Sequence, residues 1–115
     1  MKFDLILADR IRLALAHISD VEEKKMFNGI TFMVNGKMCV GVSKDRLMCR
    51  INPENHNQAL AMRGVLPVEM KGRPYVGYIY VEPAALGTDE DLRFWIDQCL
   101  LFNPQAKASK KRKGG

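Results

Sequence analysis

The sequence predicts an α+β domain of two layers, in which three helices cover one face of a five-stranded antiparallel sheet. Two observations lead to this fold class. Segments with apolar residues at helical spacing stand near both ends of the chain, and the tight turns Asn35-Gly36 and Lys71-Gly72 each separate two β-prone runs. The expected order is α-β-β-β-α-β-β-α, and 115 residues suffice for one hydrophobic core but not for two.

The two long helices are expected over residues 3–19 and 88–102. In the first, apolar residues recur at steps of three and four, so they share one face. In the last, Thr88 is a good N-cap and Asp91 completes a capping box.

A shorter helix is expected over residues 52–63. Asn52 is a favourable N-cap, Pro53 suits the first helical position, and Gly64 ends the segment. His56 lies among polar residues of this segment, so we expect it on the surface.

The strands alternate with turn signals. Val21–Lys25 is expected to extend the first strand, with a bulge near Asn28-Gly29, because glycine tolerates the backbone angles of a bulge. The five strands are expected over residues 21–34, 37–43, 46–51, 65–70 and 75–81.

Two-residue turns also predict a register. Phe32 is expected opposite Cys39, and Val40 opposite Cys49, which places the two cysteines on opposite faces. The face toward the helices should then be wholly apolar, with Met33, Met38, Val40, Val42, Leu47, Cys49 and Ile51. The other face should be mixed, with Ile30, Phe32, Val34, Lys37, Cys39, Ser43, Arg46, Met48 and Arg50.

Three tyrosines on the last strand raise the question of a stacking platform for nucleic-acid bases. Strict alternation puts Tyr75 on one face and Tyr78 and Tyr80 on the other. A platform needs aromatic rings on one exposed face with cations between them. The alternation therefore favours ordinary strand aromatics over a platform.

The excess of positive over negative charge is confined to the C-terminus. The net charge is +5, and without five cations of the last nine residues the remaining 13 basic residues balance 13 acidic ones. We therefore expect a neutral domain over residues 1–104 and a disordered tail over 105–115. The simplest role of the tail is to aid solubility, and the alternative is weak binding of nucleic acid through Lys107, Lys110, Lys111, Arg112 and Lys113.

Sequence motifs of catalysis are missing: there is no phosphate-binding glycine loop, no dinucleotide fingerprint and no nucleophile elbow. The three cysteines and two histidines lack the spacing of a metal site, so no metal and no cofactor are expected. Cys39, across from Arg50 on the mixed face, is the one candidate reactive thiol, although an inert cysteine is the commoner case. The start of the chain does not resemble a signal peptide, and we expect reduced thiols in a cytoplasm.

Three blocks of sequence resemble the N-terminal domain of the TfoX/Sxy family. They read VEEKKMFNGITFMVNGKMCVGV at 21–42, KGRPYVGYIYVEPAAL at 71–86 and DLRFWIDQCLLF at 91–102. The resemblance implies a secretion-chaperone-like α+β fold, a bacterial and cytoplasmic protein, and regulation of competence-type transcription through protein partners, without catalytic residues. Full regulators of the family carry a second, C-terminal domain, and here the basic tail stands in its place, so we expect a stand-alone version.

The leading functional hypothesis is therefore a non-enzymatic regulatory or adaptor domain that binds a protein partner, which could be a second copy of the chain. It predicts an exposed apolar patch around Phe32, Met48 and Tyr80, rimmed by arginine. The candidate interaction residues are Lys25, Phe32, Lys37, Met48, Arg50, Arg73 and Tyr80. The alternatives are a nucleic-acid accessory protein that uses its tail and a small enzyme that uses an exposed thiol.

Overall fold

The computed structural model describes residues 3–26 and 29–107. One antiparallel sheet of six strands, in the order β1-β2-β3-β4-β6-β5, forms the centre of the fold. Its strands are β1 (Val21–Met26), β2 (Gly29–Val34), β3 (Lys37–Ser43), β4 (Arg46–Arg50), β5 (Val65–Met70) and β6 (Arg73–Val81). The helices are α1 (Leu5–Ala14), α2 (His56–Leu60) and α3 (Asp89–Phe102), with 3-10 turns η1 (Pro53–Asn55), η2 (Pro83–Ala85) and η3 (Asn103–Gln105).

The predicted α+β class and antiparallel sheet are confirmed, but the prediction of five strands is wrong. Val21–Met26 does not extend the next strand: it pairs antiparallel with β2, with Val21 opposite Val34 and Met26 opposite Gly29. The chain therefore reverses direction between β1 and β2. A single strand over 21–34 would have exceeded the usual length of about 3–10 residues. Of the bulge predicted near Asn28-Gly29, Asn28 lies outside the described residues, and Gly29 pairs with Met26 of β1 and Ser43 of β3.

α1 is shorter than the helix predicted over residues 3–19, whereas α3 confirms the helix predicted over residues 88–102 with Thr88 as its N-cap. α1 begins after Asp4, whose carboxylate accepts a hydrogen bond of 3.0 Å from the Leu7 N–H. Both hydrogen bonds of the capping box between Thr88 and Asp91 are present at the start of α3. The segment expected as one helix over 52–63 instead forms η1 and α2, and Asn52 caps η1.

A bulge in β3 changes the predicted register. Val40 lies opposite Cys49 as predicted, but Phe32 lies opposite Val40 rather than Cys39, because the register shifts between Phe32 and Met33. Cys39 is the additional residue of the bulge. Two residues of β3 then oppose one residue of β2. The bulge therefore reverses the face predicted for the side chains of β2 and for the part of β3 before Cys39.

The reversal decides which side chains face the helices. Ile30, Phe32, Val34 and Cys39, which were predicted on the mixed face, lie in the main core. Met33 and Met38, which were predicted to face the helices, lie on the opposite side. This side carries a second, smaller cluster of buried residues, formed by Met33, Met38, Met48 and Val68.

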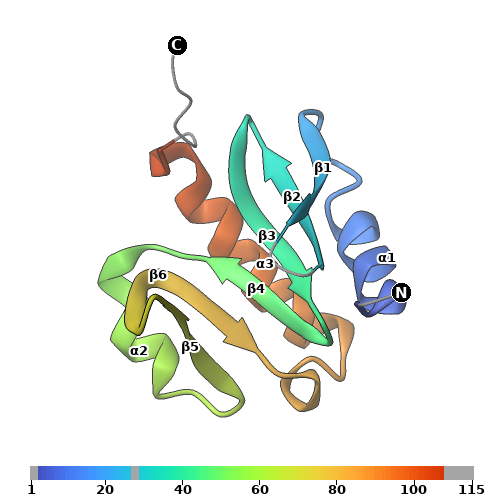
Figure 1. The fold of residues 1–115 in the computed structure, drawn as a ribbon. Coiled ribbons are helices and arrows are strands. Elements are labelled where there is room, and N and C mark those ends of the chain that lie inside the picture. The colour runs from blue at the N-terminus through green and yellow to red at the C-terminus, as the bar shows by residue number, and fades with distance from the viewer. Residues whose placement is uncertain (1–2, 27–28, 108–115) are drawn as a thin grey trace.

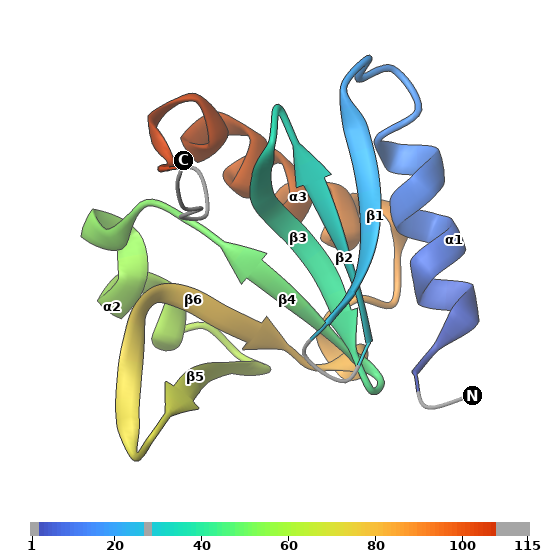
Figure 2. The ribbon, with the colours of Figure 1, turned by 45° about the horizontal axis from the view of Figure 1, so that its top comes forward.

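All three helices contribute to the main core on one side of the sheet, so the fold has the predicted two layers. Ile11 of α1, Ala59 of α2 and Trp95 of α3 belong to the same cluster of buried residues. Figure 1 shows α3 passing behind β3 and β4, with α1 beside β1 and α2 beside β5. Figure 2 shows the strong twist of the sheet, in which β5 and β6 turn away from the direction of β1 and β2.

The surface position predicted for His56 is wrong. His56 is buried at the start of α2, and its Nδ1 accepts a hydrogen bond of 3.1 Å from the Gly77 N–H. Gly77 has a φ of +93° and therefore leaves the regular β ladder. A buried backbone N–H needs a partner, and the imidazole supplies the acceptor that the neighbouring strand does not.

The folded part extends at least to Ala106, two residues beyond the predicted domain boundary. η3 includes Gln105, and the buried Ala106 donates its N–H to the Phe102 carbonyl at 3.1 Å. Lys107 is the last residue described and is exposed. The other predicted nucleic-acid-binding residues of the tail, Lys110, Lys111, Arg112 and Lys113, lie outside the described residues.

Candidate functional site

The exposed apolar patch predicted around Phe32 and Met48 does not exist. Phe32 is 0% exposed in the main core, and Met48 is 1% exposed in the smaller cluster on the other side of the sheet. Neither side chain can meet a partner without unfolding. Only Tyr80 of this predicted group, packed against the smaller cluster, reaches the surface in part.

The predicted cations have different surroundings. Lys37 Nζ donates to the carbonyls of Asn103 and Pro104 at 3.1 and 3.3 Å, so it fastens the β2–β3 hairpin to the end of α3. Arg50 donates from Nη1 to the Met38 carbonyl at 3.4 Å. Lys25 on β1 and Arg73 on β6 are exposed. The charge of Lys37 therefore has a structural use.

The buried position of Cys39 fits the inert cysteine that was predicted as the commoner case, and it contradicts the alternative of an exposed reactive thiol. Cys39, Cys49 and Cys99 are all buried in the main core, and their thiols are free. Donation of a hydrogen bond to Cys99 and burial raise the pKa of Cys39, and burial raises the pKa of Cys99 well above its ordinary value. Such thiols stay protonated and are poor nucleophiles.

We therefore expect the native protein to resist thiol reagents. Reaction with a disulfide reagent such as dithionitrobenzoate should be at least about 100-fold slower than for the protein in denaturant, because the thiols react only when the fold opens. Release of the chromophore measures the rate, and the denatured chain serves as the control for reagent access. A thiol in the folded protein that reacts as fast as free cysteine would contradict the buried arrangement.

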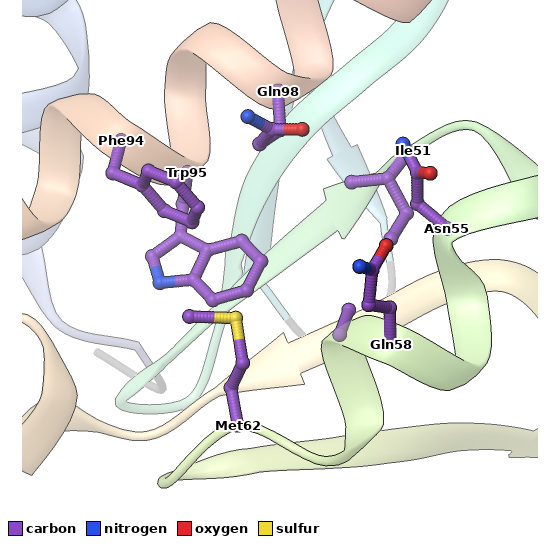
Figure 3. A pocket seen from close by; sticks show the side chains of 8 residues that line it. Ile51, Asn55, Gln58, Met62, Phe94, Trp95 and Gln98 are labelled. Carbon is purple, nitrogen blue, oxygen red and sulfur yellow. The ribbon is translucent and has the colours of Figure 1, made fainter.

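A groove lies between α2 and α3. Its main cavity has a volume of about 460 Å³ and is lined by Ile51, Asn55, Gln58, Ala59, Met62, Phe94, Trp95 and Gln98. Figure 3 shows Trp95 and Met62 side by side, with Phe94 next to the indole and Gln98 above it. None of the lining residues carries a charge. The walls are apolar, and three side-chain amides provide hydrogen-bond donors and acceptors.

A second cavity, of about 410 Å³, continues the first. The two share Met62, Phe94 and Trp95, so they form one elongated depression, here called the α2–α3 groove. Met62 and Phe94 are each 44% exposed, which is high for large apolar side chains. The Phe94 and Trp95 rings meet edge to face at 4.9 Å between centroids. This contact holds the Phe94 ring beside the cavity.

One residue of the sequence, Phe94, pointed to this groove, although it is not part of the apolar stripe of the helix. The apolar stripe of α3 follows Leu92, Trp95, Ile96 and Cys99, which are the residues it buries. Phe94 lies off that stripe, so a large aromatic ring on the solvent side of an amphipathic helix remained unexplained. Its neighbours Asn55, Gln58 and Met62 come from a distant part of the sequence, and only the tertiary structure brings them together.

The tyrosines of β6 also lie differently from the prediction. Tyr75 was expected on the opposite face from Tyr78, but their rings stack at 4.5 Å between centroids with planes 16° apart. The positive φ of Gly77 between them interrupts the alternation of the strand, which brings both rings to one side. Burial raises the pKa of Tyr78, so its hydroxyl stays protonated.

Two arginines of β4 cover rings of the adjacent strand β6. The Arg46 guanidinium lies 3.9 Å from the centre of the Tyr80 ring, and that of Arg50 lies 5.5 Å from the Tyr78 ring. These contacts are cation–π interactions. The five residues Tyr75, Tyr78, Tyr80, Arg46 and Arg50 are here called the tyrosine–arginine face. Tyr78 and Tyr80 pack against the smaller cluster of buried residues, on the side of the sheet away from the helices.

Across residues 3–26 and 29–107, no three His, Cys, Asp or Glu side chains come together as ligands for a metal ion. No helix in the same part of the chain has the length and apolar character required to cross a membrane.

Comparison with known proteins gives a family. Residues 14–102 match the family described as TfoX N-terminal domain. No curated protein and no solved structure gives a significant match. The match spans both layers of the fold, from the end of α1 to the end of α3. It includes the groove residues from Ile51 to Gln98 and the whole tyrosine–arginine face. The chain therefore belongs to the TfoX N-terminal domain family.

Proposed function

We propose that this chain is a non-enzymatic regulatory domain that acts on transcription in the bacterial cytoplasm by binding a protein partner in the α2–α3 groove. Membership of the TfoX N-terminal domain family supports a regulatory role. The observation that carries the proposal is the exposure of Phe94 and Met62 at the groove, whose main cavity has no charged lining residue.

The shape of the groove suits an apolar segment of a protein. Two joined cavities of about 460 and 410 Å³ make an elongated site rather than a closed pocket, which matches an amphipathic helix with several apolar anchors. Leu101, exposed on α3 seven residues after Phe94, extends the apolar surface along the same side of the helix. Methionine adapts its shape readily, which is common on surfaces that receive a partner helix.

The chemistry of the lining selects the same class of partner. Asn55, Gln58 and Gln98 offer amide donors and acceptors but no charge to the main cavity. In the main cavity the phosphates of a nucleic acid would find no cation to pair with. The apolar side of a helix carries no charge and needs no such partner. Aromatic and methionine side chains are also the residues most enriched at the centres of protein interfaces.

The test is a groove variant with glutamates at both exposed anchors, Met62→Glu and Phe94→Glu. Produced in place of the natural chain in its own bacterium, it should change the transcript profile in the same way as deletion of the gene. A photo-crosslinking residue at Gln98, at the groove wall, should capture a protein in the otherwise natural chain and lose it in the groove variant.

The matched control is Ile6→Glu, a glutamate on the exposed side of α1, where Ile6 is 75% exposed. The Ile6→Glu variant should have the transcript profile and the crosslink of the natural chain, because its added negative charge lies away from the groove. Circular dichroism checks that all variants are folded. A folded groove variant with an unchanged transcript profile and crosslink would overturn the proposal, as would a deletion strain whose transcription is normal.

A further inference from the structure

We propose that the tyrosine–arginine face binds single-stranded nucleic acid, with bases stacked on its rings and phosphates held by its cations. This site is separate from the α2–α3 groove: it lies on the side of the sheet away from the helices and is formed by β4 and β6. The two sites therefore predict independent effects of substitution.

The tyrosines provide surfaces for stacking. Tyr75 is 44% exposed, and its ring is held by stacking on Tyr78 at 4.5 Å. Since one side of the Tyr75 ring is supported by Tyr78, the other side is available to a base. A ring that is fixed before binding loses little conformational freedom, which favours stacking on it. Base–aromatic stacking tolerates any sequence, because every base has a π face.

The arginines add a second surface and positive charge. The Arg46 guanidinium lies over Tyr80, so its planar outer side is available to a base, as arginine planes are in RNA-binding proteins. In the register of the sheet, Arg50 lies opposite Tyr78 and Met48 opposite Tyr80. Each of the Tyr78 and Tyr80 rings therefore has one arginine of the neighbouring strand against it, so rings and cations lie together on one face, as a stacking platform requires.

The local charge selects an anionic partner. Lys71 and Arg73, at the exposed β5–β6 turn, add two cations close to Tyr75 in the chain. Within the described residues, Arg10 and Arg12 are the only cations in ion pairs. The four cations near the rings therefore have no carboxylate partner; they are Arg46, Arg50, Lys71 and Arg73. Cations without an ion-pair partner and the exposed ring of Tyr75 match a phosphate backbone with unpaired bases. In a duplex the bases are stacked on each other and cannot reach the rings.

The test measures the binding of fluorescent oligonucleotides of about 20 nucleotides to the full chain by anisotropy. The probes are oligo-dT, oligo-rU and a DNA duplex of the same length, at salt concentrations of about 50 and 200 mM. We expect both single strands to bind more tightly than the duplex, and the ratio of dT to rU tells whether DNA or RNA is preferred. Tyr75→Leu, which keeps an apolar side chain but removes the ring, should raise the Kd at least about 5-fold.

Two further variants separate the face from the basic tail. Arg46→Gln should weaken binding and lower the salt dependence by about one phosphate contact. A full-length tail variant with glutamine at Lys107, Lys110, Lys111, Arg112 and Lys113 should weaken binding of every probe, yet Tyr75→Leu should still raise its Kd by the same factor. The matched control is Phe94→Leu, because Phe94 is an aromatic residue with the same 44% exposure in the other site. It should leave oligonucleotide binding unchanged.

Three results would overturn the inference. The first is equal affinity of the natural chain, Tyr75→Leu and Arg46→Gln for both single strands, which would assign all binding to the tail. The second is binding of the duplex as tight as that of the single strands. The third is Tyr75-dependent binding of a proline-rich peptide without binding of either oligonucleotide, which would make the face a protein site. Since Tyr75→Leu, Arg46→Gln and the tail variant leave the α2–α3 groove unchanged, each of these results leaves the test of the proposed function unaffected.

Discussion

Replacing Phe32 with alanine is expected to lower the free energy of unfolding by about 3–5 kcal/mol. The phenyl ring is 0% exposed in the main core, opposite Val40 of β3, and the Arg12 guanidinium lies 5.9 Å from the ring centre. Alanine removes the buried ring and leaves a cavity that the packed sheet and helices fill only in part. Because domains of this size are stable by about 5–15 kcal/mol, the variant loses a large share of its stability.

Urea unfolding followed by circular dichroism measures this change. The matched control is Phe94→Ala, in which the same ring is removed from a side chain that is 44% exposed, and its loss should be below about 1 kcal/mol. The comparison also separates stability from binding, since Phe32 was a predicted interaction residue and Phe94 lines the groove. A Phe32→Ala variant as stable as the natural chain would show that the ring is not part of the core.

A methyl group at Gly29 is expected to cost about 3 kcal/mol or more of stability. An alanine Cβ at this position would lie 1.7 Å from the carbonyl oxygen of Val42 and 2.7 Å from its carbonyl carbon. These are backbone atoms of the paired strand β3, so the contact is relieved only by moving β2 and β3 apart. Gly29 is also the residue that faces Met26 across the β1–β2 pair, so such a shift disturbs three strands.

Thermal unfolding of Gly29→Ala tests this expectation, with Gly87→Ala as the control. No atom lies within 4 Å of a Cβ at Gly87. The free energy of unfolding of Gly87→Ala should be unchanged or raised by a few tenths of a kcal/mol, because alanine lowers the conformational entropy of the unfolded chain. If both alanine variants and the natural chain unfolded at the same midpoint temperature, β2 and β3 would have to lie further apart at Gly29 than they do in this structure.

Features set by a few adjacent residues were predictable from the sequence. Asn35 and Gly36 have φ values of 55° and 78°, as the predicted type I′ turn requires. The capping box of α3 and the N-cap at Asn52 are also present. In each case the energy that decides the conformation comes from contacts within about four residues, so the local sequence contains the necessary information.

The candidate sites depended on contacts that the local sequence does not contain. The α2–α3 groove joins Met62 to Phe94, which are distant in sequence, and the buried His56 has its hydrogen-bond partner in Gly77 of β6. The prediction for Tyr75 failed because regular alternation was assumed through Gly77, which has a positive φ. Glycine permits such an angle, but nothing local requires it.

By itself the sequence determined the α+β class, the positions of most helices and strands, the turns and the family resemblance. The tertiary structure decided the sixth strand, the faces of β2 and β3, and which residues are exposed. The bulge at Cys39 shows the reason. Within one strand, a register with or without an additional residue makes nearly the same local contacts, yet it exchanges the side chains between the two faces. The choice is made by the burial of Ile30, Phe32 and Val34 against the helices, which only the assembled fold provides.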